Sequence, residues 1–185
     1  MTGADTLAGM DKPAARRALR SRPPVTPAES SRVAAHLRVW LDERTPSRVL
    51  VYLPMAGEVD VTSVIDDRHE WFTTRTPGGD APLTVHSIHA PRERHRLGYE
   101  QPVAEAERID PASLDIILTP SLSFAKDGRR LGWGMGYYDR LYASAPDAVG
   151  VGIALDRLLV DDLPTEDHDR RMDWLATDSG VRRVR

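Results

Sequence analysis

The chain has 185 residues and a formal net charge of −3, from 25 Lys or Arg and 28 Asp or Glu. This length allows one domain with a sizeable core, and the weak negative charge disfavours a surface devoted to nucleic acid. The absence of cysteine excludes disulfides and thiolate metal sites, and it fits a reducing compartment. No secretory signal and no run approaching about 18 apolar residues is present, so we expect a cytoplasmic protein that does not use a membrane.

The N-terminal part predicts a short tail and two helices. Residues 1–11 are mixed in character, so we expect a loosely ordered tail in front of a single domain over 12–185. Pro13 suits the first turn of a helix to about Ser21, with Lys12 and Arg16 four residues apart. From its spacing alone, that pair is typical of a solvated basic face.

A second helix is predicted over 27–43. Thr26 followed by Pro27 and Glu29 forms a capping-box pattern, and apolar residues then recur at helical spacing from Val33 to Leu41. Short apolar runs at 49–53, 116–118 and 149–154 are typical of strands buried on both faces, as in a parallel sheet.

The middle of the chain gives weaker signals. Residues 61–71 are compatible with a helix. The stretch 73–110 is rich in Pro, Gly, Arg and His, and it predicts only one strand, at 83–88. A last helix is expected to begin near Tyr137 and to end at Pro146.

Alternating helices and buried strands predict an α/β fold, a three-layer sandwich with a mostly parallel central sheet flanked by helices. In such folds, ligands bind beyond the carboxyl ends of the strands. Residues 54–60 and 128–136 each follow directly on a predicted strand, so one cleft is expected to collect both segments.

The stretch 128–140 carries the chemistry that we expect. Gly132, Gly134 and Gly136 remove side chains at alternate positions, which allows backbone amides to converge on an anion. Arg129 and Arg130 add positive charge, and the N-terminus of the following helix points its dipole at the same place. The spacing matches neither the P-loop nor the dinucleotide fingerprint. A tight strand-to-helix connection, without any ligand, remains the alternative.

The whole run from Arg130 to Arg140 resembles the signature of the 5-formyltetrahydrofolate cyclo-ligase family, also called methenyltetrahydrofolate synthetases. Three other segments match the family in the same order: the pair Lys12 and Arg16, the segment 52–60 with its Glu-x-Asp element, and the tail 163–169. Together these segments span residues 12 to about 177.

The resemblance implies an ATP-dependent closure of 5-formyltetrahydrofolate to 5,10-methenyltetrahydrofolate, with release of ADP and phosphate. ATP has a chemical purpose here because a formyl amide oxygen leaves poorly. Phosphorylating it allows the second folate nitrogen to attack while phosphate departs. Such a reaction depends on alignment and charge neutralisation, so Mg²⁺ is the implied cofactor and ATP the co-substrate.

The resemblance also implies residue roles. ATP would be bound by Lys12, Arg16, Arg130, Leu131, Gly132, Trp133, Gly134, Met135, Gly136, Tyr137 and Tyr138. The folate would be bound by Leu53, Glu58, Trp133, Gly134, Met135, Gly136 and Tyr137. Arg130 and Tyr137 are implied as catalytic residues, and Asp139 and Asp173 as magnesium ligands.

Several of these residues have a second interpretation. Glu58 suits the paired N–H donors of a pterin ring, but an exposed loop carboxylate is the alternative. Tyr138 suits core packing as well as ligand contact. Met135 stands where the family usually has a very small residue, and Thr119-Pro-Ser121 stands where it more often has Val-Pro-Gly.

Two other functions therefore stay open at this stage. One is a divergent, non-catalytic paralogue that binds folate or a nucleotide for regulation. The other is an interaction protein whose glycines merely form a turn. For the enzyme we expect a monomer whose partners are a reduced folate and ATP, with neither nucleic acid nor a membrane as partner.

Overall fold

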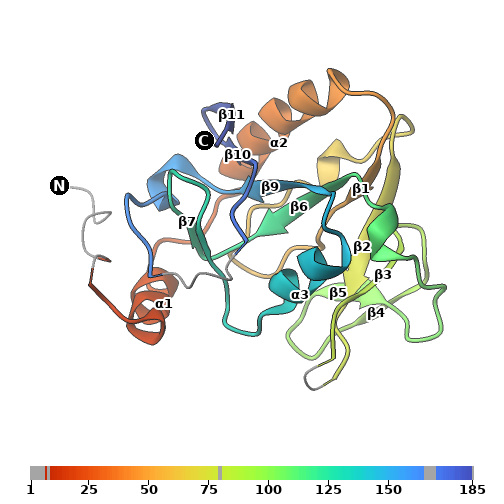
Figure 1. Ribbon diagram of the computed structural model, residues 1–185, viewed down its shortest axis with the longest axis horizontal. Helices are drawn as coiled ribbons and strands as arrows, with labels where there is room; N and C mark the ends of the chain where they lie inside the picture. The colour runs from red at the N-terminus through yellow and green to blue at the C-terminus, as the bar shows by residue number, and fades with distance from the viewer. Residues whose placement is uncertain (1–6, 8, 79–80, 165–169, 185) are drawn as a thin grey trace.

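The computed structural model describes residues 7, 9–78, 81–164 and 170–184. Its centre is a seven-stranded sheet in the order β11-β10-β9-β6-β1-β2-β3 (Figure 1). The strands are β1 (Arg48–Leu50), β2 (Glu70–Arg75), β3 (Thr84–Ser87), β6 (Ile116–Pro120), β9 (Val149–Ile153), β10 (Trp174–Thr177) and β11 (Gly180–Arg183). The five inner strands are parallel, while β3 and β11 pair antiparallel at the two edges. The predicted α/β fold with a mostly parallel sheet is confirmed.

Helices cover both faces of this sheet because side chains alternate along each strand. Val49 and Val51 lie in the core cluster that includes helix α2 (Pro27–Asp42). Leu50, between them, lies in the opposite cluster with helix α3 (Tyr137–Ser144). Figure 1 shows α2 and α3 on opposite sides of the strands. The result is the three-layer arrangement that the sequence predicts.

Two glycines of β9 allow aromatic side chains to approach the strand closely. A Cβ atom on Gly150 would lie 2.8 Å from the Tyr142 hydroxyl of α3, and one on Gly152 would lie 2.6 Å from the ring of Phe124. Both aromatic side chains therefore pack directly on the strand backbone. Phe124 belongs to a two-stranded ribbon of β7 (Ser123–Phe124) and β8 (Arg130–Leu131), which leads into the glycine loop.

The helices predicted at 13–21, 27–43 and from Tyr137 are confirmed. Helix α1 (Lys12–Arg20) begins at Asp11, whose carboxylate accepts a hydrogen bond from the Ala14 N–H at 2.7 Å. Helix α2 has the predicted capping box, in which Thr26 and Glu29 cap each other. Helix α1 packs through Ala15 and Leu19 in the same cluster as Ala125 and Leu131 of the β7–β8 ribbon. This contact places α1 beside the glycine loop.

The prediction of a helix over 61–71 is wrong. Only a 3-10 turn (Thr62–Val64) forms, because the Asp60 carboxylate accepts hydrogen bonds from the Thr62 N–H and hydroxyl at 2.9 and 2.7 Å. The chain then enters β2, which is hydrogen-bonded between β1 and β3. The strand expected at 83–88 is present as β3.

The remaining elements are short. Strands β4 (Arg92–Arg94) and β5 (Glu100–Pro102) form a hairpin, and 3-10 turns occupy Pro111–Ser113 and Asp156–Leu158. Of the expected N-terminal tail, residues 1–6 and 8 lie outside the described part. Leu7 is buried in the cluster that contains α1.

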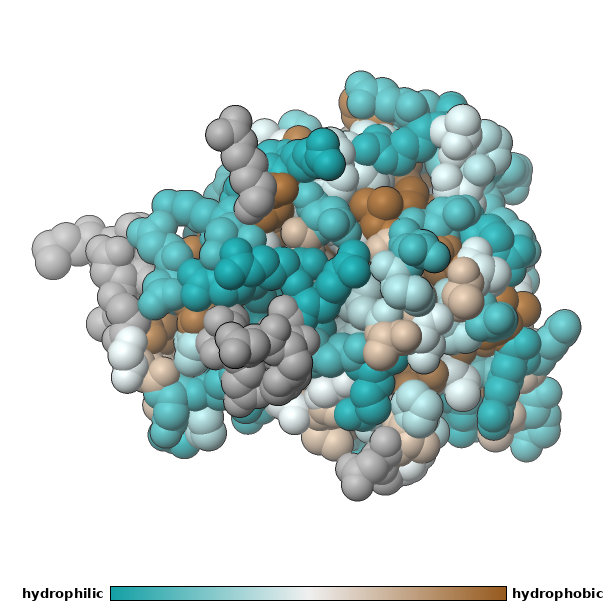
Figure 2. Space-filling view, viewed as in Figure 1, coloured by the Kyte–Doolittle hydropathy of each residue, from teal (hydrophilic) through white to brown (hydrophobic). Residues whose placement is uncertain are grey.

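The surface in the view of Figure 1 is mostly hydrophilic, with hydrophobic residues in small separate patches (Figure 2). Across the described ranges, no helix combines the length and the apolar character that a membrane crossing requires.

Candidate functional site

A cavity of about 320 Å³ lies at the carboxyl ends of β1, β6 and β9. Its walls come from the α1–α2 linker, the loop after β1, the segment after β6 and the segment after β9, and Trp133 of the glycine loop adds a further wall. This is the edge of the sheet where the α/β topology predicts a ligand site.

The loop after β1 is a compact turn that presents Glu58. The Met55 N–H donates to the Glu58 carboxylate at 2.9 Å, and the Glu58 N–H donates to the Met55 carbonyl at 3.0 Å. Gly57 between them has φ 89°, a left-handed conformation that favours glycine. The buried Tyr52 hydroxyl donates to the Val59 carbonyl and ties the loop to the end of the strand.

Glu58 contacts the glycine loop directly. The indole N–H of Trp133 donates to the second Glu58 carboxylate oxygen at 3.1 Å. Burial raises the pKa of Glu58, although the hydrogen bonds from the Met55 N–H and Trp133 act in the opposite direction. The two segments that the sequence predicted to share a cleft are therefore joined by a hydrogen bond across 75 positions of the chain.

Helix α1 supplies a cation to the glycine loop. The Arg16 side chain donates from Nε to the Gly132 carbonyl at 3.0 Å. Gly134 has φ 105°, and a Cβ atom there would lie 3.1 Å from the Arg16 guanidinium carbon. A glycine at this position therefore serves both the backbone conformation and the close approach of Arg16.

The loop leaves its amides available. Within the described part of the chain, the N–H groups of residues 132–136 donate to no protein acceptor. Gly136, with φ 63°, stands directly before the first turn of α3. Unpaired amides, an adjacent arginine and a helix N-terminus form an arrangement that can bind a phosphate group.

The buried Arg130 side chain forms an ion pair with the partly exposed Asp139 next to this loop. The Arg130 side chain is 6% exposed, and it also donates to the Arg170 carbonyl at 2.5 Å. The Asp139 side chain is 37% exposed, and it accepts from Arg130 through one carboxylate oxygen, Oδ1. The signature thus places an oriented carboxylate in the first turn of α3.

Asp173 lies in a neighbouring charged group. One of its carboxylate oxygens accepts from the Gly150 N–H at 2.7 Å and from Arg170 at 3.1 Å. The Arg130 and Arg170 guanidinium carbons lie 5.6 and 5.2 Å from the centre of the Tyr142 ring. Asp139 and Asp173 are therefore connected through two arginines around one tyrosine. No group of three or more potential metal-ligating side chains occurs in the described residues.

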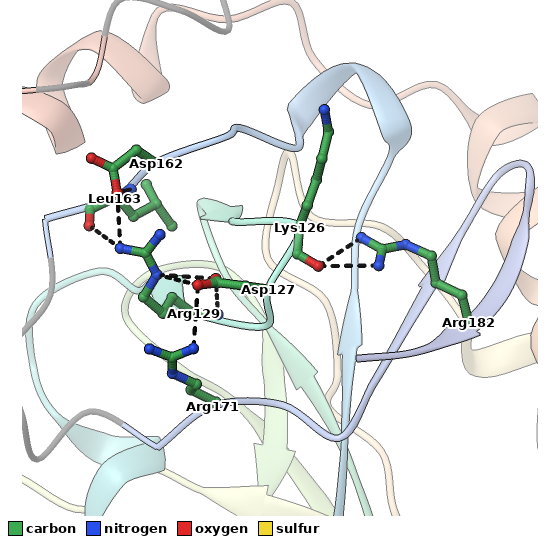
Figure 3. Close-up of polar contacts among 7 residues, drawn as sticks. All are labelled: Lys126, Asp127, Arg129, Asp162, Leu163, Arg171 and Arg182. Atoms are coloured by element: carbon green, nitrogen blue, oxygen red, sulfur yellow. Dashed lines mark hydrogen bonds and ion pairs between the residues drawn. The ribbon is translucent and has the colours of Figure 1, made fainter. Parts of the chain in front are cut away.

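Arg129, in contrast, is engaged away from the loop. Figure 3 shows its guanidinium between Asp127 and Asp162 at the β7–β8 turn. It donates to these carboxylates at 2.8 Å each and to the Leu163 carbonyl at 3.2 Å. Of the two arginines that we expected to add charge at the glycine loop, only Arg130 lies next to it, whereas Arg129 pairs with carboxylates elsewhere.

The other predicted residues surround these groups. Lys12 is half-buried at the start of α1, and Leu53 is half-buried after β1. Met135 is 53% exposed, so its bulk points largely outward. The Tyr137 ring centre lies 5.2 Å from the Arg140 guanidinium carbon, and burial together with nearby Glu58 raises the pKa of Tyr138. Leu131 is buried against α1.

One nearby residue was missed. Tyr99, which directly precedes β5, donates to the Thr76 hydroxyl at 2.8 Å, and burial raises its pKa with smaller contributions from Tyr137 and Glu58. The hairpin thus brings a tyrosine within electrostatic reach of the site. The sequence offered only Gly98-Tyr99 in a polar stretch, which gave no signal for this placement.

The family model described as the 5-formyltetrahydrofolate cyclo-ligase family matches residues 12–178. The chain belongs to this family. The resemblance carried by the glycine loop and the flanking segments is therefore confirmed, and membership identifies the chain as an enzyme of the cyclo-ligase type.

Relatives within the family agree over most of the chain. The 5-formyltetrahydrofolate cyclo-ligase of Escherichia coli K12 is 31% identical over 147 residues, covering 72% of this chain and 79% of that protein. The one from Haemophilus influenzae is 28% identical over 154 residues, covering 77% and 81%.

Solved structures agree with the cyclo-ligase fold. The 5,10-methenyltetrahydrofolate synthetase of Aquifex aeolicus superposes with a TM-score of 0.76 and 29% identity, covering 95% of this chain and 94% of that one. The synthetase of Mycoplasma pneumoniae has a TM-score of 0.73 and 22% identity, covering 91% and 99%, and it supports the fold alone.

Proposed function

We propose that this cyclo-ligase converts 5-formyltetrahydrofolate to 5,10-methenyltetrahydrofolate in a reaction that requires ATP and Mg²⁺ and releases ADP and phosphate. The hydrogen bond between Trp133 and Glu58 is the observation that carries the proposal. It joins a carboxylate suited to a pterin ring with a loop suited to a polyphosphate, so that the two substrates would meet at one place.

The folate would bind around Glu58. Each carboxylate oxygen has two lone pairs, so each of the two Glu58 oxygens can accept a further hydrogen bond beside the one from Met55 or Trp133. Paired N–H donors of the pterin would use this remaining capacity. Leu53 and the segment Trp133–Tyr137 would supply the apolar and flat surfaces around the ring.

ATP would bind along the glycine loop. The free amides of 132–136 and the Arg16 side chain would receive the phosphates, with Lys12 one helical turn from Arg16. Residues Arg130 to Tyr138 would line the nucleotide. Such binding aligns the γ-phosphate with the formyl oxygen, which is the main requirement of phosphoryl transfer.

Asp139 and Asp173 could supply part of the coordination of a magnesium ion. Mg²⁺ is usually held by one or two carboxylates together with substrate phosphates and water, so Asp139 and Asp173 suffice in number. The partly exposed Asp139 carboxylate, oriented by Arg130, can present an oxygen toward the loop. A bound magnesium ion would neutralise charge on the polyphosphate.

Arg130 and Tyr137 are the residues that we assign to the reacting groups. The formyl oxygen attacks the γ-phosphorus and ADP leaves, after which the second folate nitrogen attacks the formyl carbon and the oxygen departs with phosphate. Arg130 would stabilise the charge that develops during transfer. Tyr137, at the first position of α3, would orient the folate against the loop.

The decisive experiment is an absorbance time course of the purified protein with 5-formyltetrahydrofolate and Mg-ATP, with ADP release followed in parallel. The proposal predicts methenyl product only when ATP is present, with one ADP formed per product. An ATP-omitted reaction and an EDTA-treated reaction are the controls.

Other results would point to other functions. Folate or ATP binding in a calorimetric titration without any ADP release would identify a non-catalytic binding protein. Absence of binding by both ligands would leave the glycine loop as a structural turn.

A further inference from the structure

The cavity at the carboxyl edge has an uneven charge distribution. Among its lining residues, Glu58 is the only acid, whereas Arg20 and Arg22 are the only bases. The two arginines come from the end of α1 and from the linker that follows it. A ligand that fills this cavity would therefore meet a carboxylate at one place and two guanidinium groups at another.

Trp133 lies between the acidic and the basic end of the cavity. Its indole N–H donates to Glu58 at 3.1 Å, and its ring centre lies 5.4 Å from the Arg20 guanidinium carbon. One aromatic side chain thus contacts both the acidic and the basic end. A molecule lying along the indole would extend from one charge toward the other.

Both arginines lack an ionic partner within the described part of the chain. In the described ranges, no carboxylate contacts Arg20 or Arg22; Arg20 is exposed, and Arg22 donates to the Leu158 carbonyl at 3.0 Å. Burial and the positive charge of Arg157 lower the pKa of Arg22. An arginine remains charged in proteins, so a ligand anion at this point would relieve an unfavourable environment.

The wall that carries Arg22 is held in place. Arg157 donates to the carbonyls of Pro23 and Pro24 at 3.3 and 3.1 Å, and to the Glu29 carboxylate at 2.7 Å. The linker is therefore tied to the segment after β9 directly C-terminal to Arg22. Such a fixed wall lowers the cost of ordering a binding site.

We propose that Arg20 and Arg22 bind the carboxylates of the glutamate tail of the folate substrate. This inference rests on the proposed function, in which Glu58 receives the pterin ring. A folate is cationic or neutral at the pterin and anionic at the glutamate, and each added glutamate contributes another carboxylate. The polarity of the cavity matches this order, and guanidinium groups bind carboxylates with paired, charge-assisted hydrogen bonds.

The test compares substrates of different tail length. Initial rates are measured with the monoglutamate and the triglutamate of 5-formyltetrahydrofolate for wild type, Arg20→Gln and Arg22→Gln. Arg17→Gln is the matched control, since Arg17 is exposed on the same helix but does not line the cavity. Arg22→Lys tests whether charge alone restores binding.

We expect Arg20→Gln to raise the KM for the triglutamate roughly 5- to 10-fold, and the KM for the monoglutamate less, because it removes a partly exposed charge contact. The kcat should stay within about twofold, as for any interaction that is equal in ground state and transition state. Arg17→Gln should match wild type with both substrates, and Arg22→Lys should recover part of the loss in Arg22→Gln.

Three results would overturn the inference. One is an unchanged KM for both folates in Arg20→Gln and Arg22→Gln, and another is a rise in the folate KM of Arg17→Gln as large as that of Arg20→Gln. A rise in the KM for ATP instead of the folate would show that these arginines bind phosphate. If wild type gives no product, the proposed function fails, and calorimetric titration of the two folates against wild type and Arg20→Gln decides the role of the arginines.

Discussion

Arg129 and Arg130 are neighbours in the chain, yet they occupy opposite environments. Arg129 pairs with Asp127 and Asp162 in an open network at the β7–β8 turn (Figure 3), whereas Arg130 pairs with Asp139 in a buried position. Arg129 directly precedes β8 and Arg130 begins it, and the side chains of consecutive residues in extended chain point to opposite sides. Arg129 makes more contacts with carboxylates, but only Arg130 connects the ribbon to the first turn of α3. The number of ion pairs is therefore a poor guide to the chemical role of an arginine.

The largest expected effect separates these two arginines. Arg130→Ala should lower kcat by at least about 10²-fold, because under the proposed function it removes a charge that stabilises phosphoryl transfer, and it leaves Asp139 without its partner. Arg129→Ala should stay within about threefold, since its contacts are at the surface. Stopped or continuous product assays on both variants, with folding checked by circular dichroism, provide the measurement.

Similar rates for the two variants would contradict the distinction. Arg130→Lys sharpens it, because a lysine keeps the charge but cannot contact Asp139 and the Arg170 carbonyl with a planar fork. We expect this variant to stay well below wild type while Arg129→Lys does not.

The second effect concerns the carboxylate end of the cavity. Glu58→Gln should lower kcat/KM for the folate by roughly 10- to 100-fold, because an amide has one acceptor oxygen and the hydrogen bonds are to a charged group in the parent protein. The KM for ATP should change little. A variant with an unchanged kcat/KM for the folate would show that the pterin does not use Glu58.

The same substitution should change how stability depends on pH. Burial raises the pKa of Glu58 above its ordinary 4.5. Above pH 4.5 the unfolded chain has lost a proton that the folded chain still holds, so the free energy of unfolding falls as pH rises toward the raised pKa. This decline should be absent from Glu58→Gln. The test is urea unfolding of both proteins from pH 4.5 to 8. The free energy of unfolding is plotted against pH for each protein, and the difference between the two slopes isolates Glu58 because all other titratable groups are shared.

Local signals allowed much of the fold to be predicted. The Thr26–Glu29 capping box and the apolar runs at β1, β6 and β9 lie within a few residues of the structure they specify. Strand β2 was missed because its identity depends on a distant partner: Trp71 pairs with Val49 of β1. The apolar residues between 61 and 71 imitate helical spacing, and only the sheet decides between the two conformations.

The residues of the candidate site could be named from the sequence, but their arrangement could not. Glu58 and Trp133 could each be named from motifs, whereas the hydrogen bond between them depends on the fold. Arg20 and Arg22 could not be singled out, because an arginine-rich helix and linker give no signal that separates cavity-lining cations from solvated ones.

A moderate effect is expected where the glycine loop meets α1. Gly134→Ala should lower the free energy of unfolding by about 1–3 kcal/mol, because its φ of 105° strains an alanine and the new Cβ would lie 3.1 Å from the Arg16 guanidinium carbon. Gly132→Ala should stay within about 0.5 kcal/mol, since nothing lies within 4 Å of a Cβ there. Denaturant unfolding of the pair measures the difference. Equal losses would mean that the loop does not hold the conformation described.

The smallest effect is expected in the surface network around Arg129. Asp162→Asn removes one partner of Arg129, whose Nη1 lies 2.8 Å from that carboxylate. Because Asp162 is more than half exposed, the free energy of unfolding should fall by only about 0–1 kcal/mol, and 1 M salt should abolish the difference. Asp161→Asn is the control for a still more exposed ion pair, with Lys126. Turnover should be unchanged in both variants. A loss of activity in Asp162→Asn that persists in 1 M salt would show that the surface network positions Arg130 through the ribbon, and the two arginines would then act as one unit.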